Sequence, residues 1–193
     1  MNRKSLAAFL ITALTLLALV SCRTTGVSGN TININGMVYD FDNRPVPYCE
    51  IQMGWWHKGV TDINGRFILP NVHAGVYPVK VTRSGYETYT EEITAKDNGL
   101  IIYLRIPSQA QLLNLADQAL TANDYAAAED LADRAYQIDK KSAEALFYRA
   151  TVKFRQSEYE KAISILEDAV ALGIKDIYIE KFINTLKELI NAE

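Results

Sequence analysis

The sequence has few of the residues that build catalytic centres. It contains two His and two Cys in 193 residues. Neither His57 nor His73 is followed by a Glu at the spacing of a zinc-binding pair. The sequence also lacks a Gly-x-Ser-x-Gly elbow and a Gly-rich phosphate loop that ends in Gly-Lys-Ser/Thr. We therefore predict a protein that is not an enzyme, with no catalytic residues, no metal, no cofactor and no small-molecule substrate.

An excess of basic residues is also missing. The chain carries 20 Lys and Arg against 23 Asp and Glu. The acidic excess lies in residues 107–193, which hold 15 acidic and 10 basic side chains, whereas residues 22–106 hold eight of each. Proteins that bind nucleic acid need a basic surface to neutralise the phosphates. Nucleic acid is therefore excluded as an expected partner.

The first hydrophobic run is too short to cross a membrane. Arg3 and Lys4 precede an uncharged apolar segment that extends from Leu6 to Val20. A membrane-spanning helix needs about 20 apolar residues, whereas the core of a secretory signal has about 7–15. We therefore predict a signal peptide over residues 1–21.

The signal ends in Leu19-Val20-Ser21-Cys22, which resembles the bacterial lipobox. The resemblance implies cleavage before Cys22, followed by acylation of Cys22 with diacylglycerol on sulfur and a palmitate-type chain on nitrogen. Two or more acyl chains anchor a protein stably in a bilayer. The alternatives are an ordinary cleaved signal or an uncleaved anchor, in which Cys22 is incidental.

The residues after Cys22 indicate where the protein resides. Arg23 stands where an Asp would, in enteric bacteria, retain a lipoprotein in the inner membrane, so the outer membrane is favoured. Residues 22–30 include Gly26, Ser28 and Gly29, and we predict that they form a flexible tether. We expect a lipid-anchored protein of the bacterial cell envelope that faces either the periplasm or the exterior.

With Cys22 acylated, Cys49 is the only thiol left, and an intramolecular disulfide is excluded. Cys49, Ile51 and Met53 alternate with Glu50 and Gln52, which predicts that Cys49 lies on the apolar face of a strand. A reactive cysteine would need exposure and electropositive neighbours. We therefore interpret Cys49 as a buried structural residue.

Residues 31–106 alternate between apolar and polar positions, with turn residues between short runs. The pattern predicts seven strands and a two-layer β-sandwich with antiparallel strands, a size at which one core suffices. The predicted strands are Ile32–Tyr39, Cys49–Met53, Gly59–Thr61, Arg66–Pro70, Gly75–Thr82, Glu87–Ile93 and Leu100–Ile106.

A hairpin turn is predicted at Asp62-Ile63-Asn64-Gly65, because Asn and Gly accept the positive φ of tight turns. The same residues could begin a calcium loop. A calcium loop would continue with further oxygen ligands and a Glu between helices, whereas Phe67-Ile68-Leu69 follows here. The hairpin interpretation is favoured.

The motifs of this segment occur together in one known family. Thr61-Asp62-Ile63-Asn64-Gly65-Arg66-Phe67, followed by Gly75-Val76-Tyr77 and Ser84-Gly85-Tyr86, resembles the carboxypeptidase-regulatory-like (transthyretin-like) sandwich. This accessory module stands beside many bacterial surface and secreted domains. The second half, from Ala74 to Leu104, also resembles the related PEGA-type surface domain.

Trp55 and Trp56 follow Gly54 at the end of a predicted strand. If both side chains are exposed, this aromatic patch could bind sugar, a partner protein or a membrane interface. The alternative is that one ring covers the open end of the sandwich core.

Residues 109 to 173 contain an internal repeat. Residues separated by the same interval as Ala116 and Ala150 are alike in type. Ala128 is matched to Ala162 in the same way, and larger residues repeat at Leu112 with Leu146, Tyr125 with Tyr159 and Leu131 with Ile165. A fixed period of this length indicates units that each bury a face against the next unit. The pattern resembles the tetratricopeptide repeat (TPR), whose unit is about 34 residues long.

The TPR resemblance divides residues 107–193 into two repeats, 109–142 and 143–176, and a capping helix over 177–192. The predicted helices are Gln109–Ala122, Tyr125–Gln137, Ser142–Arg155, Tyr159–Ala171 and Ile177–Ala192. Asp124 and Ser157 stand where helix caps are expected, and Gly173 is expected to end the fourth helix.

In TPRs the first helix of each repeat lines a groove that binds a protein or peptide. Carried over by alignment, the groove-lining residues here are Leu113, Asp117, Thr121, Phe147, Thr151 and Arg155. The alternative is that some of them, Leu113 and Phe147 above all, belong to the core or contact the sandwich. The Lys/Asn clamp with which some TPRs hold a C-terminal carboxylate is not matched.

Together these observations predict an α+β chain of two domains: a seven-stranded antiparallel sandwich at 31–106 and all-α TPR hairpins at 107–193. The leading hypothesis is a non-enzymatic lipoprotein that acts as a protein–protein interaction scaffold. A second is a surface module in which the sandwich binds glycan or peptidoglycan. A third is a structural subunit of an envelope complex.

Overall fold

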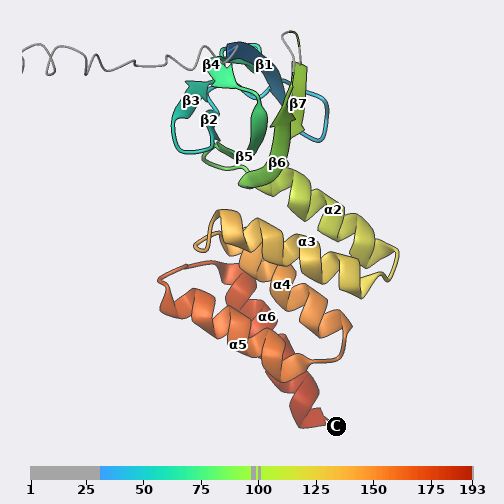
Figure 1. Cartoon of the computed structure of the whole chain (residues 1–193). Coiled ribbons are helices and arrows are strands. Elements are labelled where there is room, and N and C mark those ends of the chain that lie inside the picture. Colours follow the sequence, from blue (N-terminus) through green and yellow to red (C-terminus); the bar gives the residue numbers. More distant parts are fainter. Residues whose placement is uncertain (1–30, 97–98, 100, 193) are drawn as a thin grey trace, which may run out of the picture. The chain divides into compact units, whose positions relative to one another are not determined.

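The computed structural model describes residues 31–96, 99 and 101–192. The predicted signal peptide, Cys22 and the tether lie outside these residues. In the described part of the chain, seven strands in two sheets are followed by five helices, which confirms the predicted α+β organisation (Figure 1). Within the described residues, none of the helices combines the length and the hydropathy needed to cross a bilayer.

The strands form a three-stranded sheet in the order β4-β1-β7 and a four-stranded sheet in the order β3-β2-β5-β6. Their bounds are β1 Thr31–Tyr39, β2 Glu50–Met53, β3 His57–Val60, β4 Arg66–His73, β5 Gly75–Thr82, β6 Tyr89–Ala95 and β7 Ile101–Arg105. One expectation was wrong: β7 pairs with β1 in parallel, so the sandwich is not wholly antiparallel. The reason is that β7 returns from the other sheet to the open edge of β1.

The sandwich core lies between the two sheets. In β1 every second side chain is buried, including Ile32, Ile34 and Val38, because successive residues of a strand point to opposite faces. Ile51 and Met53 of β2 meet them from the other sheet within one continuous apolar cluster. The alternation read from the sequence therefore identifies the inward faces.

The turn before β4 forms at the predicted residues, but it joins strands of different sheets, β3 and β4, so it is not the β-hairpin that was expected. The Asp62 carboxylate accepts hydrogen bonds from the backbone N–H groups of Asn64 (2.8 Å) and Arg66 (2.9 Å). Gly65 has φ of 74°, and a Cβ there would lie 2.6 Å from the carbonyl oxygen of Val38. Asp62 thus caps its own turn, and Gly65 is required by both conformation and space.

Cys49 is completely buried, as predicted. Its backbone N–H donates to the hydroxyl of Thr61 at 2.8 Å, and that hydroxyl donates to the carbonyl of Val46 at 2.9 Å. Burial raises the pKa of the Cys49 thiol, and neither the hydrogen bond of Thr61 nor the charge of Arg83 cancels the effect. The thiol therefore stays protonated and serves as a small core residue.

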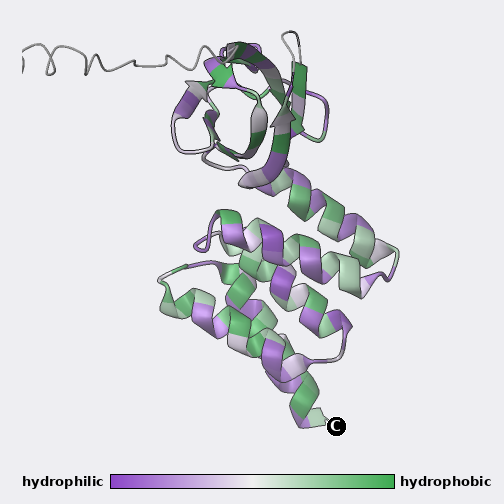
Figure 2. Ribbon diagram, viewed as in Figure 1, coloured by the Kyte–Doolittle hydropathy of each residue, from purple (hydrophilic) through white to green (hydrophobic). Residues whose placement is uncertain are grey.

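The helices follow the predicted positions closely. They are α2 Gln109–Thr121, α3 Tyr125–Ile138, α4 Ala143–Arg155, α5 Tyr159–Ala171 and α6 Ile177–Ala192. Each packs against the next one in the chain, and α2 also packs against α4. Figure 2 shows hydrophobic and hydrophilic positions alternating along each helix, as expected of helices that bury one face.

The turn between the paired helices has the same geometry in both repeats. Asn123 has φ of 59°, and Ser157, its equivalent in the second repeat, has φ of 62°. The next residues, Asp124 and Glu158, are the N-caps of α3 and α5. The expected cap role of Ser157 was wrong, because Ser157 supplies the left-handed residue of the turn.

Alanines let the paired helices approach closely. Ala116, Ala128, Ala150 and Ala162, the repeat-related pairs, are completely buried. Helix α6 packs Ile179, Ile183 and Leu186 into the cluster of the second pair, as the predicted capping helix should. Gly173, with φ of 82°, follows α5 where a stop was expected.

The junction between β7 and α2 is held by specific contacts. Ser108 caps α2 in a capping box with Gln111. The Glu87 backbone N–H donates to the carbonyl of Pro107 at 2.9 Å. The Glu87 carboxylate also accepts two hydrogen bonds of 2.8 Å from the guanidinium of Arg134 on α3. These bonds connect the first helix pair to the strand edge beside β6.

Candidate protein-interaction surface

The residues predicted to line the groove lie on α2 and α4, the first helices of the two pairs. Leu113 is only 2% exposed and belongs to the core cluster between α2, α3 and α4. For this residue the core alternative holds. Asp117, Thr121 and Arg155 are exposed, and Phe147 and Thr151 are half-buried. We call these five residues the first-helix surface.

Asp117 acts electrostatically on Tyr148 of the neighbouring helix. Tyr148 is half-buried on α4 and packs in the two apolar clusters that involve α2. Its pKa is raised, first by burial and then by the negative charges of Asp117 and Glu144 and a hydrogen bond to Asp117. The phenol therefore remains protonated beside the negative charge of Asp117.

Phe147 contacts the last helix. Its ring centroid lies 5.4 Å from that of Phe182 on α6, and Phe182 in turn lies 5.7 Å from Phe154. Rings at such separations attract each other beyond the apolar area they bury. Helix α6 therefore covers part of Phe147, and Phe182 extends the first-helix surface onto a third helix.

The remaining residues are ordered by local contacts. The hydroxyl of Thr121 donates to the carbonyl of Asp117, and that of Thr151 donates to the carbonyl of Phe147. The Arg155 guanidinium donates to Asn123 Oδ1 at 2.9 Å and lies 5.7 Å from the ring centroid of Tyr125. The end of α4 is thereby joined to the turn that follows α2.

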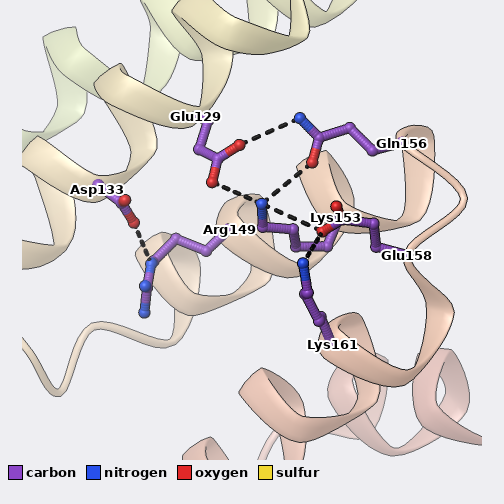
Figure 3. A network of polar contacts seen from close by, with 7 residues as sticks. All are labelled: Glu129, Asp133, Arg149, Lys153, Gln156, Glu158 and Lys161. Atoms are coloured by element: carbon purple, nitrogen blue, oxygen red, sulfur yellow. Dashed lines mark hydrogen bonds and ion pairs between the residues drawn. The ribbon is translucent and has the colours of Figure 1, made fainter.

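The outer side of the α3–α4 contact carries a network of ion pairs (Figure 3). Lys153 Nζ lies 2.5 Å from Glu129 Oε1 and 3.3 Å from Glu158 Oε2. Arg149 Nε lies 2.5 Å from Asp133 Oδ1, and its guanidinium carbon lies 4.3 Å from the ring centroid of Tyr136. The network joins the second helix of one pair to the first helix of the next.

The network shifts the pKa values of its members in a consistent direction. Its hydrogen bond to Lys153 lowers the pKa of Glu129, and burial opposes this without cancelling it. Burial alone would lower the pKa of Lys153, but the hydrogen bonds and charges of Glu129 and Glu158 outweigh it and raise that pKa. Both groups are therefore charged throughout the physiological pH range.

Trp55 and Trp56 lie at the tip of the β2–β3 hairpin. Their side chains are 84% and 89% exposed, so neither ring covers the core, and that alternative was wrong. The other end of the sandwich core is closed by residues such as Ile106 and Val46, which are buried. The paired indoles are thus an exposed aromatic patch, and the ligand of this patch stays a prediction.

The arrangement offers contact surfaces. In the part of the chain that the structure describes, no three His, Cys, Asp or Glu side chains gather as they would around a metal ion. The first-helix surface instead presents one acidic and one basic side chain, two hydroxyls and a partly covered aromatic ring. Such a mixture suits a polypeptide, which offers backbone groups and side chains of both charges.

Three residues beside the first-helix surface were not predicted from the sequence. Tyr148, Asn123 and Phe182 all contact residues of the first-helix surface. Tyr148 directly follows Phe147, but the TPR alignment did not include it among the groove-lining residues. Asn123 could have been found from its place before the predicted cap Asp124, since Asn tolerates positive φ.

Two family models match the chain. Residues 33–102 match the carboxypeptidase regulatory-like domain. Residues 121–179 match the family described as anaphase-promoting complex, cyclosome, subunit 3, which is a TPR-like helical family. The chain therefore contains a carboxypeptidase regulatory-like β-sandwich followed by a TPR-like helical region, and both are non-catalytic kinds of domain. The comparison with curated proteins gives no match.

Solved structures resemble part of the chain. A type II cohesin–X-dockerin complex from Acetivibrio cellulolyticus is 19% identical over 39% of this chain, with a TM-score of 0.34. Catechol 1,2-dioxygenase from Acinetobacter sp. ADP1 is 13% identical over 44%, and the major pilin subunit of Bacillus cereus is 12% identical over 41%, both with a TM-score of 0.34. The matches span 56%, 55% and 29% of those chains, and no activity or partner follows from them.

Proposed function

We propose that the chain is a non-enzymatic lipoprotein of the bacterial cell envelope, anchored by acylated Cys22, whose helices bind another protein through the first-helix surface. The lipobox-like Leu19-Val20-Ser21-Cys22 supports the anchor. The TPR-like repeat supports the scaffold role, because such arrays present the first helices of their pairs to a ligand. A short peptide or one helix of a partner suits an array of two pairs.

One observation carries this proposal above the others. The turn geometry recurs at Asn123 and Ser157, which are equivalent positions of the two repeats, so the two pairs are similar units that present equivalent faces. On those faces Asp117 and Thr151 occupy equivalent positions of α2 and α4, with Asp117 exposed and Thr151 half-buried.

The test is a charge reversal at the two accessible ionic residues in the full-length chain. Asp117→Lys and Arg155→Glu are expected to abolish co-purification of a protein partner from native membranes after crosslinking. Glu160→Lys, on an exposed position of α5, is the matched control and should leave the partner bound. Equal recovery of the partner with all three variants would refute the first-helix surface as the binding site.

A second candidate rests on the exposure of Trp55 and Trp56. Paired exposed indoles can stack on sugar rings, so the sandwich could bind glycan or peptidoglycan while the helices support it. Sedimentation with purified peptidoglycan, lost in the Trp55→Ala/Trp56→Ala variant and kept in Asp117→Lys, would favour this function over the first.

A further inference from the structure

Trp55 and Trp56 lie in the loop of a hairpin whose base is held by hydrogen bonds. Met53 pairs with His57 across the turn, which leaves Gly54, Trp55 and Trp56 as the loop. Gly54 has φ of 59°, its N–H donates to the carbonyl of Pro78 at 2.8 Å, and its own carbonyl accepts from Gln52. The base of the loop is thus hydrogen-bonded to β2 and β5, while both indoles are exposed to solvent.

The strand registers place this loop at the end of the sandwich where the described chain begins. Thr31, the first residue of β1, pairs with His73 at the end of β4. The Tyr77 hydroxyl donates to the His73 carbonyl at 3.0 Å, and the Tyr77 ring lies 6.1 Å from that of His57, next to Trp56. Helix α2 follows from the other end, after the last residue of β7.

The length of chain before Thr31 limits how far this end can lie from the membrane. Thr31 is the ninth residue after Cys22, and such a segment spans at most about 30 Å when fully extended. An acylated Cys22 would therefore keep the Thr31 end of the sandwich within that distance of the bilayer surface. Trp side chains favour the boundary between lipid headgroups and acyl chains, where an apolar ring and an N–H group are both accommodated.

We propose that Trp55 and Trp56 insert into the headgroup region of the same bilayer that holds Cys22, so that the sandwich docks on the membrane by its hairpin tip. This inference rests on the proposed lipid anchor. Lys58, exposed two residues after Trp56, can reach lipid phosphates with its amine while its methylene groups lie along the interface. Docking would fix the orientation of the sandwich and direct the helices, which leave from the opposite end, away from the lipid.

Intrinsic fluorescence reports directly on this contact, because Trp55 and Trp56 are the two Trp residues of the sequence. The acylated protein is bound to phosphatidylcholine vesicles with and without brominated acyl chains. We expect emission at shorter wavelength than in detergent-free buffer and a loss of intensity on brominated vesicles. Trp55→Phe and Trp56→Phe, each with a single remaining indole, should show the loss separately.

The matched control moves the indole to the opposite end of the sandwich. Phe41 is 41% exposed in the loop after β1, so Phe41→Trp in the Trp55→Phe/Trp56→Phe background should emit as in water and keep its intensity on brominated vesicles. Equal quenching of this control and the wild type would overturn the docking proposal.

Vesicle flotation separates failure of docking from failure of the anchor. If the wild type floats but its indole fluorescence is quenched by acrylamide and not by brominated lipid, the docking proposal is overturned and the lipid anchor is retained. Wild type that does not float, or a Cys22→Ala/Trp55→Ala/Trp56→Ala variant that floats equally well, overturns the anchor and the docking with it. An emission change caused by peptidoglycan fragments and not by brominated lipid would overturn the docking and assign the indoles to the second candidate function.

Discussion

Lys153 on α4 and Glu129 on α3 form an ion pair of 2.5 Å that joins one helix pair to the next. The Lys153 side chain is only 17% exposed, and Gln156, the C-cap residue of α4, donates to the other oxygen of Glu129 at 3.1 Å. The carboxylate is therefore bound at both oxygens by residues at the end of α4, which connects α3 to α4. An isolated surface pair would contribute less, because it orders two free side chains for one contact.

The pair predicts a pH dependence of stability. Because the folded state lowers the pKa of Glu129, its contribution is complete above the ordinary Glu pKa and is lost as the pH falls through the lower folded value. The raised pKa of Lys153 makes its contribution complete below the ordinary Lys pKa and lost at higher, strongly alkaline pH. We expect Glu129→Gln to destabilise the helices at neutral pH and to reduce their sensitivity to acid.

Denaturant unfolding of both proteins at neutral and acid pH, followed by far-UV circular dichroism, measures this difference. Glu160→Gln, an exposed residue of α5, serves as the control and should show the wild-type pH profile. An identical acid response in Glu129→Gln and wild type would contradict the assigned role.

The close approach of α4 and α5 predicts that a larger side chain at Ala150 is not tolerated. Ala150 is completely buried, and inserting methylene groups into a packed core costs about 1–3 kcal/mol. Ala150→Leu should therefore lower the free energy of unfolding, whereas Ala126→Leu, on an exposed position of α3, should change it little. Thermal melts of the two variants provide the measurement, and equal stability would show that the helices are not in contact there.

A comparison of Ala substitutions at Gly65 and Gly85 distinguishes the cost of backbone strain from the cost of a steric clash. Both have positive φ, 74° and 81°, but a Cβ at Gly65 would lie 2.6 Å from the Val38 carbonyl, whereas none of the neighbouring atoms lies within 4 Å at Gly85. Left-handed strain in a non-Gly residue costs about 1–3 kcal/mol. In denaturant unfolding, Gly65→Ala should lower the free energy of unfolding by more than that amount, because β1 must also move to make room for the Cβ. A smaller loss of stability in Gly65→Ala than in Gly85→Ala would be inconsistent with the turn geometry.

The anchor is tested by a single substitution. Cys22→Ala removes the sulfur that acylation requires, so the protein should move from the membrane fraction to the soluble fraction of the envelope. Ser28→Ala, which leaves Cys22 intact, is the control and should remain with the membrane. Radiolabelled palmitate incorporated equally into Cys22→Ala and wild type would contradict the assignment of Cys22.

The parts of the fold that depend on local pattern could be predicted from the sequence. Alternation identified the inward residues of β1, and the repeat located the helices, because burial imposes a period on each element. The parts that depend on long-range pairing could not. Parallel addition of β7 to β1 follows from the path of the chain between sheets, and the alternation within β7 is the same in either direction.

In the candidate site, too, features local to one helix could be predicted from the sequence, whereas contacts between helices could not. The TPR resemblance placed Asp117 and Arg155 on the accessible side of their helices, but it could not show that Leu113 is buried. The burial of Leu113 depends on how closely α2, α3 and α4 approach, which the spacing along one helix does not reveal. Phe182 was missed for the same reason, since its contact with Phe147 crosses between helices that are distant in the sequence.

Site-specific photocrosslinking in the native envelope tests the central claim most directly. A photoreactive residue is placed at Thr121 or Thr151 on the first-helix surface, at Ser164 on the exposed side of α5, or at Thr94 on β6. We predict crosslinks to one polypeptide from Thr121 and Thr151, lost when Arg155→Glu is added, and none to that polypeptide from Ser164 and Thr94. Crosslinks from Thr94 or Ser164 alone would contradict the proposed role of the first-helix surface.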